Sequence, residues 1–194
     1  MRYDLATAGW TCQREGVRII HIVCRVDAEM GKVLFTQTKR ALVLACGNPL
    51  QGDNGVALEV AKSLVCGFCD GETEVHWQHQ WLPVMAEAIS GANLVVFLEA
   101  SHEIASGAVY ARLLVPAASP LEAPDGAISP DKLLLLALEL YHSLPEEAYL
   151  VSIGGDSFEC SDQLSQRVRR AIPLALNQVK AILSGVSLPQ AMVV

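Results

Sequence analysis

The chain has 194 residues, of which 52% are hydrophobic, and its mean hydropathy of +0.33 is enough to build one large core. Its net charge of −7 argues against nucleic acid as a partner, and no apolar run reaches the roughly 20 residues of a membrane span. The start of the chain shows no signal-peptide pattern, and its six cysteines are scattered, so we expect a cytoplasmic protein without a membrane partner.

The first 39 residues contain two β-rich runs, at 17–26 and 32–37, which flank the segment DAEMG. This pattern predicts a β-hairpin or added edge strands. We therefore expect residues 1–39 to form an N-terminal β extension packed on the core, and residues 40–194 to form a single α/β domain.

The core begins with a strand, a tight loop and a helix. Residues 41–46 form a short apolar run that predicts a strand buried on both faces. Val56, Val60 and Leu64 then recur every four residues, which is typical of one face of a helix. Asp53 or Asn54 stands where the helix would be capped. The loop lies at the carboxyl end of its strand, where open α/β sheets bind ligands.

Further strands and helices alternate along the rest of the chain. Apolar or alternating runs predict strands, and proline and serine mark helix starts. The run at 109–115 is close enough in sequence to the strand before it to pair with that strand antiparallel. The expected strands are 74–79, 94–98, 109–115 and 149–153, and the expected helices begin at Pro83, Ser129 and Asp162. This order predicts a three-layer α/β sandwich with a mostly parallel, doubly wound sheet of the phosphorylase/hydrolase-like type.

Three loops should meet at the carboxyl edge of that sheet, namely 47–55, 99–102 and 154–159. Glu99 is the leading site candidate, because a carboxylate that ends an apolar strand is costly to bury without a partner. The alternative is that backbone amides or a buried arginine hold it. We expect Asp53, Asn54 and Glu99 to share one solvent-reached cleft, although Asp53 could simply cap the first helix.

Four motifs in the same order resemble the hydrogenase maturation endopeptidases. They are GNPLQGDNGVALEVA, HQWLPVMAEAI, ISPDKLLLLALELY and GGDSFECSDQLSQRVRRAIPLAL, and the resemblance covers about residues 40–183. This resemblance implies the family's activity, which is the hydrolysis of one peptide bond in a nickel-loaded hydrogenase large-subunit precursor, with release of its carboxyl-terminal tail. The nickel belongs to the precursor, so we expect no metal or other cofactor in the isolated protein.

The resemblance also assigns roles to individual residues. Asn54, Glu99 and Asp131 match the positions that grip the nickel, where the family has an acid, usually an aspartate, and a histidine, respectively. Asp53 and Glu99 are the implied catalytic residues, and His102 could replace the missing histidine. The implied substrate-binding residues are Gly47, Asn48, Gly155, Ser157 and Glu159.

Two other functions stay open. The substituted ligand positions fit a catalytically impaired homologue that still binds a protein partner, because a neutral amide is a poorer ligand than a carboxylate. The same sheet edge would also suit an unrelated hydrolase of a small ligand.

Overall fold

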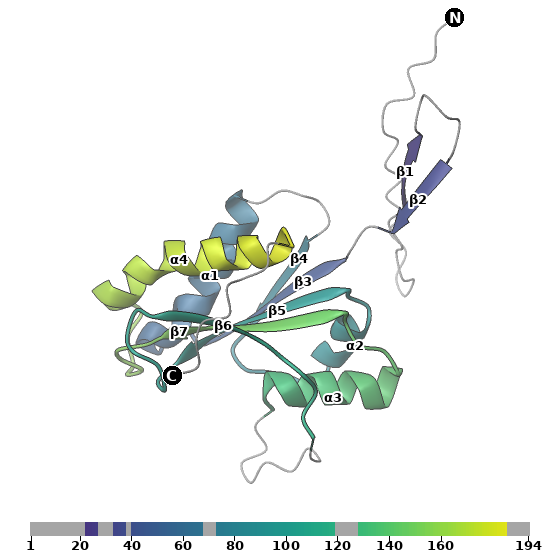
Figure 1. Ribbon diagram of the computed structural model, residues 1–194. Coiled ribbons are helices and arrows are strands. Elements are labelled where there is room, and N and C mark those ends of the chain that lie inside the picture. Colours follow the sequence, from purple (N-terminus) through teal and green to yellow (C-terminus); the bar gives the residue numbers. More distant parts are fainter. Residues whose placement is uncertain (1–21, 27–32, 38–39, 68–72, 119–127, 186–194) are drawn as a thin grey trace, which may run out of the picture. The chain divides into compact units, whose positions relative to one another are not determined.

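A computed structural model describes residues 22–26, 33–37, 40–67, 73–118 and 128–185 of the chain (Figure 1). The chain divides into two compact units, residues 1–39 and 40–194, and each is described by itself. In the first unit, β1 (Ile22–Val26) pairs antiparallel with β2 (Val33–Gln37). The packing of this extension on the core stays a prediction.

The second unit is built on one five-stranded sheet with the strand order β4-β3-β5-β7-β6. Its strands are β3 (Ala41–Cys46), β4 (Thr73–Gln78), β5 (Leu94–Ser101), β6 (Val109–Leu113) and β7 (Glu147–Gly154). The first four in spatial order are parallel, and β6 alone is antiparallel. The three apolar runs expected in the sheet interior are β3, β5 and β7, so this prediction is confirmed.

The expected partner of β6 was wrong. β6 pairs with β7, whereas β5 is already flanked by β3 and β7. The turn before β6 lies directly on the end of β7, where Gly107 N–H donates to Gly154 O and Gly154 N–H donates to Ala108 O. A Cβ atom at Gly154 would overlap the carbonyl oxygen of Ala105. Only glycine therefore allows this close approach of the two segments.

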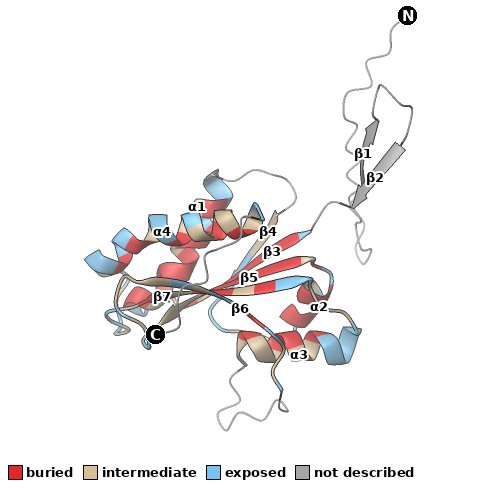
Figure 2. Ribbon diagram, in the orientation of Figure 1, coloured by how far each residue is buried: buried red, intermediate tan, exposed pale blue. Residues whose placement is uncertain are grey.

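Among the described residues, α-helices cover both faces of the sheet, as Figure 1 shows. They are α1 (Val56–Gly67), α2 (Met85–Ser90), α3 (Pro130–Tyr141) and α4 (Gln166–Leu183). α1 and α4 share one buried cluster with Val43, Val96 and Val151, and α2 and α3 share another with Leu44, Phe97 and Leu150 (Figure 2). Strand residues alternate between these two clusters, which confirms the three-layer α/β sandwich.

The last helix begins later than the sequence pattern predicted. α4 starts at Gln166 rather than at Asp162, and the side chain of Ser165 caps it by accepting from Val168 N–H. The segment before it is extended loop, because its backbone amides bind elsewhere, as described below. No helix in the described part of the chain is both long and apolar enough to span a membrane.

Candidate functional site

The carboxyl edge of the sheet carries a polar row across its three central strands. The register sets Cys46 of β3 beside Glu99 of β5, and Glu99 beside Ser152 of β7. Each of these residues follows a core residue by two positions, namely Leu44, Phe97 and Leu150, so the row lies on the α2/α3 face. Glu99 does not end its strand as expected, because β5 continues to Ser101.

Glu99 is half-buried and has weak partners. The indole N–H of Trp81 donates to its Oε2 at 3.4 Å, and the hydroxyl of Ser152 donates to its Oε1 at 3.5 Å. Burial raises the pKa of this carboxyl group above its usual value, although the two hydrogen bonds and the charge of Arg112 oppose that rise. Within the described residues no cation forms an ion pair with Glu99. The carboxylate is therefore available to a ligand.

Trp81 fixes the wall of the site beside Glu99. Its ring packs edge-on against Phe97, with the ring centroids 5.4 Å apart. Trp81 comes from the segment between β4 and α2, so this contact ties the end of the neighbouring strand to the carboxylate. Cys46 neighbours both Glu99 and the backbone of Trp81. Burial first and the charge of Glu99 second raise the pKa of its thiol to about 12, and a hydrogen bond with the Trp81 backbone opposes that rise. The thiol is therefore protonated at neutral pH.

Asp53 has a different environment from the one expected. Its side chain is 0% exposed, so the prediction that it faces a solvent-reached cleft is wrong. Its Oδ2 accepts from the backbone N–H groups of Asp156 (2.8 Å) and Ser157 (3.0 Å), and its Oδ1 accepts from Ser165 N–H at 2.6 Å. Burial opposes the charge, but these amides outweigh burial and hold the pKa of Asp53 below its usual value.

The same contacts join the first loop to the last one. Gly52 N–H donates to Ser161 O, and Asp53 N–H donates to Ser157 O, both at 2.8 Å. Ser161 N–H returns a bond to Leu50 O at 3.0 Å. A Cβ atom at Gly52 would lie 2.7 Å from Ser157 O, and the residue has a φ of +55°, so both the space and the backbone require glycine. Asp53 thus stabilises the loop that carries Asn54.

Asn54 lies over the end of β3. A Cβ atom at Gly47 would overlap the backbone oxygen of Asn54 and would lie 3.3 Å from its Oδ1. The side-chain amide of Asn54 donates to Gln51 Oε1 at 2.9 Å, which leaves Oδ1 as an acceptor for a ligand. Because Gly47 follows Cys46, which lies beside Glu99, Asn54 belongs to the same edge of the sheet. Its sharing of an ion with Glu99 stays a prediction.

The other two ligand candidates lie on separate segments. Asp131 is in the first turn of α3, after the N-cap Ser129. His102 is exposed and packs edge-on against Phe158, with ring centroids 6.2 Å apart. Within the described ranges no hydrogen bond or ion pair joins either residue to Glu99, and no group of three or more His, Cys, Asp or Glu residues is placed to hold a metal.

Comparisons with known proteins find likeness in structure alone. No family model matches the sequence, and no curated protein matches it. Among solved structures, the hydrogenase maturating endopeptidase HybD from E. coli has a TM-score of 0.62 at 23% identity, over 75% of this chain and 93% of that one. The chain has the fold of the hydrogenase maturation endopeptidases. Two archaeal proteins agree with this assignment.

The first archaeal protein is the hydrogenase 2 maturation peptidase from a Thaumarchaeota archaeon, with a TM-score of 0.56 at 21% identity, covering 77% of this chain and 100% of that one. The second is the [NiFe] hydrogenase maturation protease HybD from Thermococcus kodakarensis, with a TM-score of 0.55 at 22% identity, covering 74% and 98%. The match therefore covers nearly the whole length of these endopeptidases and about three quarters of this chain.

On this maturation-endopeptidase fold, the five implied substrate-binding residues fall into two groups. Gly47 and Gly155 pack closely against other parts of the edge, since a Cβ atom at Gly155 would overlap the ring of Phe158. Asn48 accepts from Leu50 N–H through its side chain, whereas Ser157 and Glu159 are exposed. Substrate binding by these residues stays a prediction.

Sequence reasoning missed three residues of the site. Trp81 and Ser152 bind Glu99, and Cys46 borders it. Trp81 was within a recognised motif, HQWLPVMAEAI, but nothing local indicated its partner. Ser152 and Cys46 could have been found by counting two residues past Leu150 and Leu44, which face the α2/α3 cluster on their strands.

Proposed function

We propose that the chain is a processing endopeptidase that removes the carboxyl-terminal tail of a nickel-loaded hydrogenase large-subunit precursor. The observation that supports this proposal most is Glu99, a half-buried carboxylate without an ion-pair partner among the described residues, at the carboxyl edge of a maturation-endopeptidase fold. The four motifs that resemble this family lie in order along the same fold.

In this proposal the nickel arrives as part of the substrate, and the isolated protein holds no metal of its own. Glu99 contacts the nickel through its carboxylate and thereby orients the adjacent peptide bond. Asn54 offers a neutral amide oxygen from the loop over β3. Asp53, assigned above as catalytic by resemblance, acts here by positioning that loop, because its carboxylate is fully used by backbone amides.

Two further residues complete the proposed ligand set. Asp131 lies at the start of α3, where it supplies a second carboxylate in place of an imidazole. His102 restores an imidazole if the loop after β5 moves, since it is exposed and its ring contact with Phe158 is the one side-chain contact that the described part of the chain gives it. The proposed precursor and the cysteine usage both favour a cytosolic location.

A second candidate function is that of an impaired homologue that binds the precursor without cleaving it. Asn54 favours this candidate, because replacing a carboxylate with an amide weakens the grip on a divalent cation. The lack of a three-ligand group in the described part of the chain favours it too.

The test is incubation of the protein with a nickel-loaded large-subunit precursor from the same organism. The proposal predicts release of the tail by the wild-type protein and a loss of at least about 100-fold in rate for Glu99→Gln, which keeps the shape and removes the charge. Glu87→Gln is the matched control, because Glu87 is an exposed carboxylate on α2. Binding without cleavage would favour the impaired homologue, and neither binding nor cleavage would contradict both functions.

A further inference from the structure

β4 is an edge strand of the described sheet, and its outward backbone groups are open at Val75 and Trp77. Gln78 O accepts from Gly47 N–H, so Gln78 and His76 direct their peptide groups toward β3. Val75 and Trp77, which alternate with them, therefore direct theirs away from the sheet. Within the described residues no hydrogen bond reaches these outward groups of Val75 and Trp77. A free edge of this kind is a template for another extended chain.

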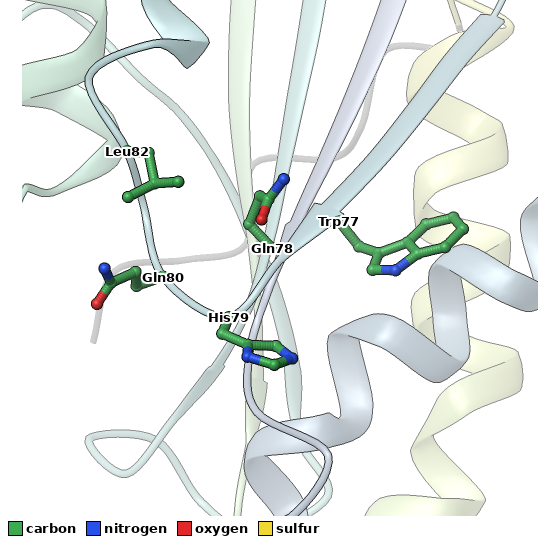
Figure 3. A pocket seen from close by; sticks show the side chains of 5 residues that line it. All are labelled: Trp77, Gln78, His79, Gln80 and Leu82. Carbon is green, nitrogen blue, oxygen red and sulfur yellow. The ribbon is translucent and has the colours of Figure 1, made fainter.

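A shallow pocket of about 500 Å³ lies at the carboxyl end of the same strand. Figure 3 shows its five side chains spread along the end of β4 and the segment that follows, namely Trp77, Gln78, His79, Gln80 and Leu82. Trp77 is 50% exposed, which is unusual for a large aromatic side chain. The two glutamine amides offer both donors and acceptors, which suits a peptide main chain.

The segment after β4 contributes to both the pocket and the candidate site. Gln80 and Leu82 line the pocket, and Trp81 between them donates its indole N–H to Glu99. The free backbone groups of β4, the pocket lining and the Glu99 partner Trp81 therefore belong to one stretch of chain, residues 75–82.

We propose that the precursor's tail binds as an added strand on β4 and places a side chain near the cleaved bond in this pocket. The inference rests on the proposed function. If the cleaved bond lies at Glu99, the tail beyond it runs from the carboxyl edge toward the start of β4, so it pairs antiparallel with β4. Addition of an extended peptide to an exposed sheet edge is a recurring mode of peptide recognition, and antiparallel pairs are slightly more stable per residue than parallel ones.

Strand spacing sets the length of the crossing segment. β3 separates β4 from β5, so an added strand lies three spacings of about 4.8 Å from Glu99, or about 14 Å. An extended chain covers this distance with about four residues. The first tail residue that pairs with Trp77 therefore lies about four residues beyond the cleaved bond. A tail shortened to fewer than about six residues loses the pairing.

The experiment measures amide hydrogen exchange in the full chain, with and without a synthetic peptide that spans the cleavage site and tail of the organism's large-subunit precursor. The amides of Val75 and Trp77 should become protected on binding, whereas that of Leu113, on the opposite edge, should not. Leu113 is a matched control because Leu114 N–H faces β7, so Leu113 faces outward from β6. Unchanged exchange at Val75 and Trp77, with the peptide bound, would overturn the inference.

Three variants separate the backbone from the side chain. Trp77→Val keeps the outward N–H and removes the indole, whereas Trp77→Pro removes both, and proline is tolerated at such edge positions. We expect Trp77→Pro to bind the peptide about tenfold more weakly than Trp77→Val, as the loss of one hydrogen bond implies. Leu113→Pro should bind like the wild type. Equal affinity of the two Trp77 variants, with both folded by circular dichroism, would contradict strand addition.

The outcomes also separate this inference from the proposed function. Cleavage of the precursor without protection of β4 would leave the endopeptidase function intact and overturn the inference. Protection of β4 without cleavage would support the docking and contradict the endopeptidase function. Protection of the same amides before any peptide is added would mean that residues 1–39 or a second copy occupies the edge, which would also overturn the inference.

Discussion

Replacing Asp53 with asparagine should weaken the contact between the first and last loops of the domain. The wild-type carboxylate accepts three backbone N–H groups, from Asp156, Ser157 and Ser165, and has 0% exposure. An asparagine can turn its oxygen toward two of these amides, but its NH₂ group then faces the third. One charge-assisted hydrogen bond, worth about 1.5–3 kcal/mol, is lost, and the other two become neutral. Removing the buried charge offsets part of this cost, so we expect a net loss of about 3 kcal/mol.

The assay is urea unfolding of the full chain, followed by tryptophan fluorescence and far-ultraviolet circular dichroism. About 3 kcal/mol is a large part of the 5–15 kcal/mol that stabilises a typical domain. Glu59→Gln is the control, because Glu59 forms an exposed pair with Lys62 at 2.8 Å and should contribute less than about 0.5 kcal/mol. A change below about 1 kcal/mol for Asp53→Asn would refute the reasoning.

The difference in unfolding free energy between wild type and Asp53→Asn should also depend on pH. The pKa of Asp53 is lowered in the folded state, so the stability it contributes is fully present above the unfolded pKa of about 3.9. That stability is lost as pH falls through the lower folded pKa. The difference in unfolding free energy between wild type and Asp53→Asn should therefore narrow as the pH falls below about 4. A difference that is constant over this pH range would mean that the charge of Asp53 makes no contribution.

Two further predictions concern the groups beside the site. Trp81→Phe removes the indole N–H that favours the charged form of Glu99, so the pKa of Glu99 should rise above its already raised value. ¹³C NMR of the Glu99 carboxyl group during a pH titration measures this pKa, and a lower pKa in the variant would contradict the prediction. Cys46 should react slowly with a thiol reagent at pH 8, because the pKa of its thiol is raised to about 12. Cys160 is exposed, so Cys160→Ala should remove one rapidly reacting thiol, whereas Cys46→Ala should remove none. Rapid labelling of Cys46 would mean that the thiol is neither buried nor suppressed by Glu99.

The parts of the fold that depend on local pattern could be predicted from the sequence. β3 is an apolar run between Arg40 and a Gly-Asn-Pro turn, and its bounds agree with the prediction. The partner of β6 could not be predicted in the same way, because strand pairing is decided by residues about 40 positions away. α4 starts later than predicted because Ser165 caps it, and the N–H of Ser165 binds Asp53, which lies more than 100 positions earlier in the chain.

The site residues also divide into those that a local sequence pattern indicates and those that depend on distant parts of the chain. Glu99 could be identified because a carboxylate interrupts an apolar strand, and this physical signal is local. The burial of Asp53 could not be predicted from the sequence. An aspartate can cap a helix or can bridge two distant loops, and the sequence looks the same in both cases. Trp81 was recognisable only as part of a motif, since its role depends on the close approach of the segment after β4 to β5.

The most direct test of the central claim is the intact mass of the precursor after incubation with the wild-type protein, with nickel-loaded and nickel-free precursor compared. The account predicts that the nickel-loaded precursor loses the mass of its tail, that the nickel-free precursor keeps it, and that Glu99→Gln leaves both unchanged. An unchanged mass of the nickel-loaded precursor, or equal cleavage with and without nickel, would contradict the account.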